Sequence, residues 1–452
     1  MDAESGRAIV GLESDAAAAR IFLRLLRVSA NLQRSFDAKR SGTRIFLKSC
    51  AELRQRIARR GGAAQKDQKK PAHSSNKSIT TETLPPFRHP TARRKEIHLK
   101  KIFLVLVLTA TAAVAKANNA GAVYTATNSA TDNQVLIFDR SADGSLSAAG
   151  AISTGGRGLG TGLGNQSGIT LTQNHAFLFV VNAGSNEISS FSVGPQGLTL
   201  ADKVWSGGQR PISVTTHDNF LYVLNAGGTN NITGFSIGSD GKLTAIAGST
   251  SPLSVANANP AQIAFNGDGT LLAVTEKGTS RIDTYTVDGF GVAQGANVFA
   301  SAGSTPFGFN FGKRNQIVVS EAAGSAASSY SVSSSGQLTP ISSSIADHQA
   351  AACWLVVSND GRYAYAANAA SASVSGYAID ADGTLSLLNS DGRTGVTSPG
   401  PVDETMSANG RFLYTLNARS GTISVFSVRA DGSLDKQADV PVQVNTNGFA
   451  AR

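Results

Sequence analysis

Residues 410–434, GRFLYTLNARSGTISVFSVRADGSL, contain two apolar segments joined by a polar turn and followed by a turn with glycine. Apolar residues alternate with small or polar ones in both segments, as is typical of half-buried antiparallel strands. The second segment belongs to a type that occurs seven times, with one aromatic residue in each copy. These aromatics are Phe138, Phe191, Phe235, Tyr285, Tyr330, Tyr377 and Phe426. Their mean spacing of 48 residues predicts a repeat protein.

A further apolar segment precedes each pair in copies two to seven, for example PISVTT at 211–216 and PAQIAF at 260–265. Each unit therefore has four strands in about 48 residues, the length of one β-propeller blade. Seven such units account for residues 118–452. We predict an all-β fold, a seven-bladed β-propeller of four-stranded antiparallel blades.

The first copy begins at its second strand, VYTATN (123–128), and the chain ends in an additional segment, NTNGFAA (445–451). A ring of blades has no free sheet edge only if this segment completes the first blade, which protects the edges against aggregation. We therefore expect the C-terminal strand to be the innermost strand of the first blade.

The formal net charge of +9 would favour a nucleic-acid partner if the charge were spread over the whole chain. Residues 1–101, however, contain 23 Lys and Arg against 9 Asp and Glu, whereas residues 102–452 contain 17 against 22. The basic residues thus gather in the first hundred positions. No nucleic-acid partner is expected for the propeller, which we expect to be a monomer.

Residues 98–117, HLKKIFLVLVLTATAAVAKA, combine two lysines, an apolar run and small residues in an Ala-x-Ala pattern. This combination is typical of a secretory signal peptide. The apolar run is shorter than the roughly 20 residues that a membrane span requires. We predict a periplasmic or secreted protein that begins near residue 118 and is not stably inserted in the membrane after cleavage.

Residues 1–97 form a basic extension, expected to be mostly irregular or helical and to carry no chemistry. The favoured interpretation is a start codon assigned too far upstream. A cytoplasmic or organelle-targeting extension, and a basic surface-binding helix at residues 19–34, are the alternatives.

Cysteines, histidines and acidic turns give no support for a disulfide, a metal or a cofactor. Cys353 is the only cysteine after residue 101, so it has no intramolecular disulfide partner there, and we interpret it as a buried, inert thiol. The histidines include no pair at metal-ligand spacing. DADGTL (380–385) resembles a calcium loop but lacks the EF-hand spacing, and we interpret it as a hairpin turn with Gly383 at positive φ.

The second strands end in a polar residue in every copy, and these residues are predicted to ring one face of the propeller. They are Asn128, Asn182, Asn225, Glu276, Glu321, Asn368 and Asn417. Asparagine at such a place is interpreted as a turn cap that bonds to its own backbone. Glu276 and Glu321, in the fourth and fifth blades, are either turn residues of the same kind or a pair of carboxylates for acid and base catalysis.

The first strands begin at the same face, beside the central channel. The candidates there are Gln166, Arg210, Gln262, Phe307, Trp354, Asp403 and Asn447. Arg210 is either a cation that holds a carboxylate or an oxyanion or a solvated surface residue. Trp354 is either a platform for a sugar-like ring or part of the core. Together with Gln262, Phe307 and Asp403 they form the predicted substrate-binding set.

With these blade sequences in view, residues 122–450 resemble the seven-bladed lactonase family, which includes bacterial 6-phosphogluconolactonases and fungal carboxymuconate-cyclising enzymes. AGAVYTATN, TPFGFNF, VVSEAAGSAASSY and AACWLVV resemble its exported branch. The resemblance implies a catalytic glutamate at Glu321. It also implies a histidine and two arginines at the starts of blades four, five and seven, but Pro260, Thr305 and Val402 stand near those places. Phosphogluconolactone is therefore disfavoured as the substrate.

Two functions follow from this reading. The first is an exported lactone hydrolase in which Glu321, with Glu276, acts as general base and Arg210 or backbone amides stabilise the oxyanion. The second is a non-catalytic propeller that binds a small molecule, a glycan or a protein at the channel mouth. The arrangement of Glu276, Glu321 and Arg210 in space discriminates between them.

Overall fold

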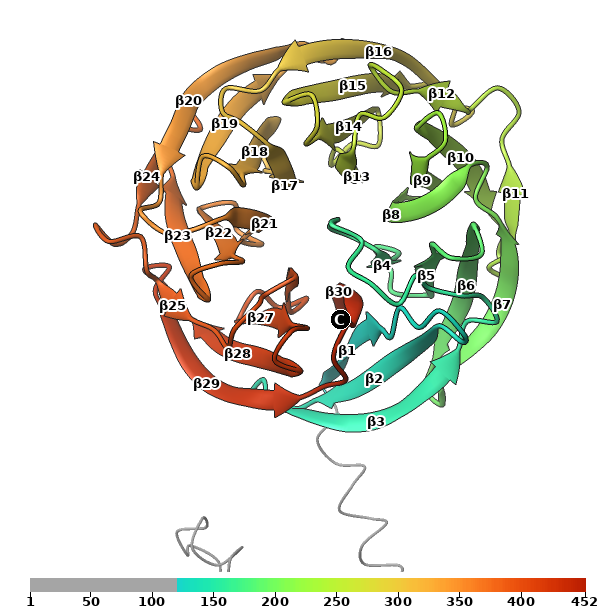
Figure 1. The fold of residues 1–452 in the computed structure, drawn as a ribbon, viewed down its shortest axis with the longest axis horizontal. Helices are drawn as coiled ribbons and strands as arrows, with labels where there is room; N and C mark the ends of the chain where they lie inside the picture. The colour runs from blue at the N-terminus through green and yellow to red at the C-terminus, as the bar shows by residue number, and fades with distance from the viewer. Residues whose placement is uncertain (1–119) are drawn as a thin grey trace, which may run out of the picture. The chain divides into compact units, whose positions relative to one another are not determined.

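A computed structural model describes residues 120–452, which form a ring of seven antiparallel sheets (Figure 1). The predicted seven-bladed all-β propeller is confirmed. The predicted extension (1–97) and signal peptide (98–117) lie outside the described residues. Among the residues that are described, no helix is long and apolar enough to cross a membrane.

The first four blades are built as follows. Blade 1 contains β1 (Gly121–Ala126), β2 (Gln134–Arg140), β3 (Leu146–Ser153) and β30 (Asn447–Ala451). Blade 2 contains β4 (Ile169–Leu171), β5 (Phe177–Asn182), β6 (Glu187–Gly194) and β7 (Gly197–Trp205). Blade 3 contains β8 (Gln209–His217), β9 (Phe220–Gly227), β10 (Asn231–Ile237), β11 (Leu243–Ala245) and β12 (Ser251–Pro252). Blade 4 contains β13 (Pro260–Phe265), β14 (Leu271–Glu276), β15 (Arg281–Val287) and β16 (Ala293–Ala300).

The other three blades repeat this order. Blade 5 contains β17 (Pro306–Phe311), β18 (Gln316–Glu321), β19 (Ala326–Val332) and β20 (Leu338–Ala346). Blade 6 contains β21 (Ala352–Val357), β22 (Tyr363–Asn368), β23 (Ser373–Ile379), β24 (Leu385–Leu387) and β25 (Gly395–Val396). Blade 7 contains β26 (Asp403–Met406), β27 (Phe412–Asn417), β28 (Thr422–Val428) and β29 (Leu434–Pro441). In blades 3 and 6 the outer edge is divided between two short strands, because β12 pairs with β10 and β25 pairs with β23.

Burial falls from the middle strands to the outer strands of each blade. Every residue of β14, β18 and β27 is buried, whereas β16 and β29 are mostly exposed or half-buried. Both faces of a second strand pack against neighbouring blades, so apolar residues on both faces are shielded from water. The outermost strand meets solvent and accepts polar residues.

The C-terminal strand closes the ring, as predicted. β30 pairs antiparallel with β1, with Tyr124 opposite Ala450 and Thr125 opposite Phe449. Arg140, itself buried, donates to the carbonyl oxygen of Arg452 from Nε at 3.2 Å and from Nη2 at 3.1 Å. The last strand is thus held by a sheet ladder and by a buried guanidinium.

The glycine turns between third and fourth strands join neighbouring blades. At six junctions between described blades, a side chain of one blade donates a hydrogen bond to the glycine carbonyl of the next blade's turn. The pairs are Ser190–Gly241, Tyr222–Gly291, Thr284–Gly336, Ser329–Gly383, Tyr365–Gly432 and Tyr414–Gly144, at 2.7 to 3.1 Å. Gly383 has φ 94°, which confirms the predicted hairpin turn of DADGTL. The repeated glycine therefore serves the contact between blades as well as the turn.

Replacing Gly432 by alanine is expected to cost more stability than the same change at Gly248. Both glycines have positive φ, 83° and 77°, so alanine is strained at both, by roughly 1 kcal/mol. A Cβ at Gly432 would overlap the ring of Tyr363, whereas a Cβ at Gly248 meets nothing within 4 Å. Urea unfolding of the two variants measures the difference, which we expect to be about 2 kcal/mol. Equal losses would show that the turn alone, and not the blade contact, requires glycine.

Candidate functional site

The connection between β3 and β4 reaches the centre of the ring (Figure 1). Its residues 164–167, here called the channel segment, hydrogen-bond to strands from several blades. The Asn165 side chain donates to the Ile212 carbonyl in blade 3 and accepts from Asn447 of blade 1 at 2.8 Å. The Asn165 carbonyl accepts from the indole N–H of Trp354 in blade 6 at 2.8 Å. A single residue thus ties three blades together across the channel.

Gln166 and Ser167, the next two residues of the channel segment, form further hydrogen bonds to the blades. Gln166 donates to the carbonyl of Leu355 and accepts from its amide, both at 2.9 Å. The Ser167 carbonyl accepts from the amide of Val214 at 2.8 Å, and its hydroxyl accepts from Gln262 at 3.3 Å. The polar side chains of the channel segment are thus hydrogen-bonded to protein.

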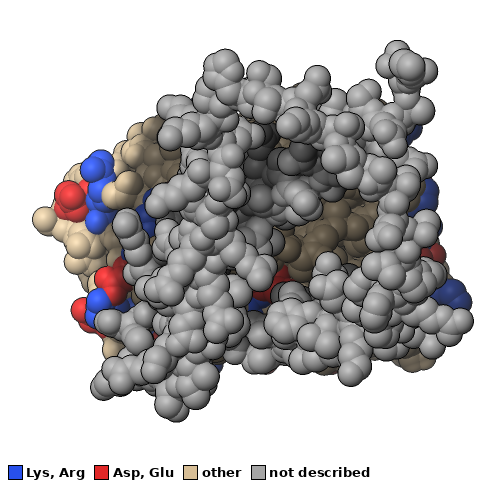
Figure 2. Space-filling model, turned by 90° about the horizontal axis from the view of Figure 1, so that it is seen from below, with Lys and Arg blue, Asp and Glu red and all other residues tan. Residues whose placement is uncertain are grey.

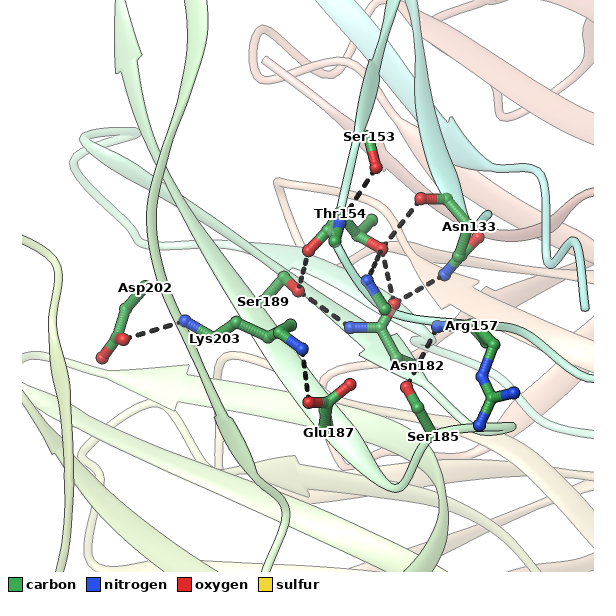
Figure 3. A network of polar contacts seen from close by, with 12 residues as sticks. Asn133, Ser153, Thr154, Arg157, Asn182, Ser185, Glu187, Ser189, Asp202 and Lys203 are labelled. Atoms are coloured by element: carbon green, nitrogen blue, oxygen red, sulfur yellow. Dashed lines mark hydrogen bonds and ion pairs between the residues drawn. The ribbon is translucent and has the colours of Figure 1, made fainter. Parts of the chain in front are cut away.

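The asparagines that end the second strands join three parts of the propeller. Figure 3 shows Asn182, which donates to Ser189 at 2.8 Å and accepts from Thr154 at 2.7 Å and from Asn133 at 3.0 Å. The side chain therefore links its own blade to blade 1 and to the connection before β4. The expected bond to its own backbone is replaced by bonds to hydroxyl and amide groups.

The same spacing recurs in other blades, where the residue seven positions later on the third strand is a serine. Asn368 lies 2.8 Å from Ser375, and Asn417 lies 2.9 Å from Ser424. In blades 2, 6 and 7 the residue that ends the second strand is thus bonded to a serine of the third strand, whereas Asn128 of blade 1 bonds to Leu159 and Thr161 in the connection between β3 and β4.

Glu321 occupies this structural place in blade 5. It is fully buried and accepts hydrogen bonds from the hydroxyl of Ser328, seven positions later, and from Ser344 at 2.6 Å. Its carboxylate lies against Gly303, where any side chain would overlap it. Both oxygens of Glu321 are therefore engaged by serines of the outer half of its own blade.

Glu276 occupies the corresponding place in blade 4 and is also fully buried. It accepts from the amide and hydroxyl of Ser254, at 3.0 and 2.6 Å, and from Thr279 at 2.5 Å. The residue seven positions later is Asp283, which accepts from the same Ser254 amide at 2.9 Å. The carboxyl that neighbours Glu276 is thus Asp283, and Glu276 and Glu321 share no hydrogen-bond partner.

Asp283 is fully buried, and one of its carboxyl oxygens has no hydrogen-bond partner. Burial raises its pKa to about 8, and the hydrogen bond with Glu276 and the negative charge of that residue act in the same direction. Arg281 opposes this with a smaller effect. At neutral pH the Asp283 carboxyl is therefore mostly protonated, because two ionised carboxylates cannot share one buried site at low cost.

Arg210, Lys277, Phe307, Cys353 and Trp354, here called the channel mouth, come from four different blades. Phe307 and Trp354 are buried and stack edge to face, with ring centroids 5.3 Å apart. Arg210 is exposed, has φ 53°, and its amide donates to Asn186 at 2.7 Å. A left-handed backbone in a residue other than glycine is a local strain that the surrounding contacts must support.

Of the other predicted binding residues, Gln262 and Asp403 lie deeper, at the channel segment. The Gln262 side chain accepts from the amide of Phe309 at 2.7 Å. Asp403 is buried, and burial raises its pKa well above the usual range although the Ser167 amide opposes the shift. Its second carboxyl oxygen has no partner. These two residues are placed to hold the channel segment rather than to contact a ligand at the mouth.

Lys277 is a residue of the mouth that the sequence did not single out. Its ammonium donates to the carbonyls of Gly164, in the channel segment, and of Pro260, the latter at 3.0 Å. It also lies 4.9 Å from the centroid of the Phe307 ring, a cation–π distance. Lys277 directly follows Glu276 on the chain, but Gly164 is more than a hundred positions away, so no local pattern marks the contact.

Electrostatics at the mouth are set by two cations without carboxylate partners. Among the described residues, neither Arg210 nor Lys277 belongs to an ion pair. Burial lowers the pKa of Lys277 to about 8, and the charge of Arg210 lowers it further. Burial raises the pKa of the Cys353 thiol to about 12, so the thiol is neutral, as expected for an inert buried cysteine.

The visible surface shows no comparable excess of one charge. Where described residues are visible in Figure 2, Lys and Arg lie close to Asp and Glu. No group of three or more His, Cys, Asp or Glu suited to a metal ion occurs between residues 120 and 452. Arg210 and Lys277 are thus set apart by their position beside the channel, and not by the lack of an ion pair.

Solved structures with the same fold include lactonases. A candidate 6-phosphogluconolactonase from Bacteroides fragilis has a TM-score of 0.62 at 19% identity, over 75% of this chain and 99% of its own. The periplasmic gluconolactonase PpgL of Pseudomonas aeruginosa has a TM-score of 0.59 at 19% identity, over 73% and 98%. At such identities the likeness shows the fold alone. No curated protein matches the chain.

A family model described as lactonase, 7-bladed beta-propeller, matches residues 116–255 and 318–451. The two ranges together make up more than half of the chain. The segment between them includes blade 4 with Glu276, Lys277 and Asp283. The extent of this match and the seven closed blades show that the chain belongs to the lactonase family of seven-bladed β-propellers.

Proposed function

We propose that the protein hydrolyses a small lactone at the channel mouth. The observation that carries this proposal is the position of two cations, Arg210 and Lys277, beside the channel, with Lys277 next to the buried Phe307 ring, in a member of the lactonase family. A lactone has an apolar ring face and a carbonyl oxygen that becomes negative when water attacks the carbonyl carbon. Fixed cations at such a position stabilise the developing oxyanion.

The proposed reaction is the addition of water to the lactone carbonyl, followed by cleavage of the ring C–O bond and protonation of the ring oxygen. Arg210 and Lys277 bear the positive charge that the tetrahedral intermediate requires. Glu321 is the base that the family resemblance implies, and its oxygens are held by Ser328 and Ser344. We propose that this carboxylate maintains the blade and that the cations contribute more to the rate.

Three variants of the purified protein test these roles with a panel of γ- and δ-lactones. Lys277→Met and Arg210→Ala are each expected to lower kcat/KM by about 100-fold, as the loss of one oxyanion-stabilising group does. Glu321→Asn restores the residue found at this place in five blades and is expected to change kcat/KM less than threefold. A loss in Glu321→Asn as large as in the cation variants, with an unchanged melting temperature, would instead assign the base to Glu321.

The second function, a non-catalytic propeller that binds a ligand at the mouth, is favoured by a specific observation. Glu276 and Glu321 are both buried and hydrogen-bonded by serine side chains, and Pro260, Thr305 and Val402 stand near the places of the family's basic residues. Absence of turnover by the unchanged protein, with saturable lactone binding in calorimetry, would support this function over hydrolysis.

We further propose that the protein is exported to the periplasm or the medium. The support is the run of two lysines, apolar residues and Ala-x-Ala pattern at residues 98–117. N-terminal sequencing of the protein isolated from cells is expected to begin near residue 118. A mature chain that still contains residues 98–117 would contradict export by this signal.

A further inference from the structure

Exposed apolar side chains gather at the face of the ring where the second strands end, here called the mouth face. Second and fourth strands of an antiparallel blade run in the same direction, so the outer strands end there too. Of the seven large apolar residues that are exposed between residues 120 and 452, four lie at this face, 41 to 64% exposed. Trp205 ends β7 and Val396 ends β25, while Val255 and Val444 lie in the connections that follow β12 and β29. Single exposed apolar residues are ordinary, but a set on one face calls for a physical reason.

An arginine lies near each of these four residues. Trp205 pairs across the ladder with Glu187, and the charge of Arg157 acts on that glutamate. Arg393 precedes Val396 by three residues, just before β25 begins. Arg157 and Arg393 are both exposed, so their charges are available at the surface.

Contacts place the other two arginines. Arg281 donates at 3.2 Å to the hydroxyl of the residue before Val255. Arg419 lies two residues before Gly421, and a Cβ at Gly421 would lie 3.2 Å from Val444. None of the four arginines forms an ion pair with another described residue. Because a guanidinium does not lose its proton in proteins, each pair presents an apolar side chain beside a permanent positive charge.

The two faces of the ring differ in their acidic residues. The connections that join successive strands at the mouth face contain two acids, Asp132 and the fully buried Asp347, against three basic residues, Arg157, Lys277 and Arg419. The turns at the opposite face contain nine aspartates, most of them followed by glycine, against six basic residues. An anionic partner is therefore attracted more strongly to the mouth face than to the opposite face.

We propose that the mouth face adsorbs to an anionic lipid surface through these four pairs of apolar residue and arginine. Figure 1 shows β7 and β12 on one side of the ring and β25 and β29 on the other, so a partner that meets all four pairs has to be broad and flat, as a bilayer is. Apolar side chains enter the headgroup region, and arginines bind lipid phosphates. Tryptophan suits this interface because its ring is amphipathic. Only side chains enter the bilayer, and the inference does not depend on hydrolysis of a lactone.

Phe290 is an internal control for apolar exposure without a cation. It is 83% exposed, more than Trp205, but it lies in the turn between β15 and β16 at the opposite face. Its amide donates to the carboxylate of Asp288 at 2.9 Å. A negative charge held so close repels anionic lipid, so the proposed surface does not extend to Phe290.

The fluorescence of Trp205 tests the inference on the full chain. Trp205 and Trp354 are the two tryptophans of the sequence, and Trp354 is only 6% exposed. Vesicles of phosphatidylglycerol and phosphatidylcholine are expected to shift the emission of Trp205 to shorter wavelength, and brominated acyl chains are expected to quench it. The basic residues 1–101 attract anionic vesicles by themselves, but they contain no tryptophan, so contact through them alone leaves this signal unchanged.

Two double variants with the same net charge separate the faces. Arg393→Gln with Arg419→Gln is expected to raise the lipid concentration for a half-maximal shift roughly 25-fold, since each basic residue near an anionic membrane contributes about fivefold. Lys313→Gln with Arg411→Gln removes two charges from the opposite face and is expected to change it less than twofold. An equal effect of the two double variants would overturn the inference.

A pair of apolar variants makes the same comparison. Val444→Ser is expected to raise the half-maximal lipid concentration about threefold, and Phe290→Ser to leave it unchanged although Phe290 is more exposed. A shift as large with phosphatidylcholine alone, or one that persists when the salt is raised from 0.1 to 1 M and the Debye length falls from about 10 to about 3 Å, would contradict the role of the arginines. A shift with dissolved polyglutamate and none with vesicles would overturn lipid as the partner and assign the face to an acidic macromolecule.

Discussion

Deletion of residues 447–452 is expected to prevent formation of the closed propeller. The deletion removes β30, which supplies the innermost strand of blade 1, and leaves β1 with an open edge. It also removes Phe449, which is 5% exposed, from the core of blades 1 and 7. Replacing such a phenylalanine by alanine alone costs about 3 to 5 kcal/mol. A whole domain is stable by only about 5 to 15 kcal/mol, so the deletion is expected to yield unfolded or aggregated protein.

Circular dichroism and size-exclusion chromatography measure this result on the soluble fraction. Addition of a synthetic peptide of residues 445–452 during refolding is expected to restore a cooperative melting transition, because β30 joins its blade by ladder hydrogen bonds. Phe449→Ala provides a milder variant of the same edge, and Lys436→Ala on the outer strand β29 provides a surface control. A deletion variant with the melting temperature of the unchanged protein would show that the ring closes without its last strand.

The number of blades and the closure of the ring were predictable, because both follow from the spacing of the sequence repeats. One aromatic strand recurs about every 48 residues, and the chain places three strands of one blade at the start of the series and the fourth at its end. The turn glycines were assigned correctly to hairpins. Their second role, as acceptors for Tyr222, Ser329 and similar residues of the preceding blade, depends on the distance between blades, which the period does not specify.

The candidate site was less predictable, because a channel brings together residues that are far apart on the chain. The ring of polar residues was located from the aligned strand ends, but whether a side chain points to the channel or into its own blade is not visible in that alignment. The serine seven positions after Glu321 is a usable signal, since Asn182, Asn368 and Asn417 have the same partner. Asp283 stands at this place after Glu276, and Val135 and Ile232 stand there in blades 1 and 3, so the signal applies to four blades.

The stability of the protein is expected to increase as the pH falls from 8 to about 5.5, and Asp283 is expected to contribute to this beside Asp403 and Glu404, two other buried carboxyls with raised pKa. In the folded chain Asp283 keeps its proton up to about pH 8, because it is buried beside Glu276. In the unfolded chain a carboxyl of this type loses its proton near its ordinary value of about 4. Between these values the folded state binds more protons than the unfolded state, so the free energy of unfolding decreases as the pH rises. The stabilisation is complete in acid and is lost as the pH passes 8.

A pKa shift of this size corresponds to several kcal/mol of unfolding free energy in full. We expect a change of about 2 kcal/mol between pH 5.5 and pH 8, because Asp283 and Glu276 share the effect. Urea unfolding at a series of pH values measures it. Asp283→Ser is the matched variant, since a serine at this place donates to Glu321 in blade 5 and would donate to Glu276 in the same way. This variant is expected to reduce the pH dependence by the share of Asp283 and to be more stable than the unchanged protein at pH 8. The double variant Glu276→Asn, Asp283→Ser copies the pair of blade 6, Asn368 and Ser375. It is expected to show the same change in pH dependence as Asp283→Ser. If the slope between pH 5.5 and 8 is unchanged in both variants, Asp283 does not hold the proton, and Glu276 and Asp283 do not form a pair that shares it.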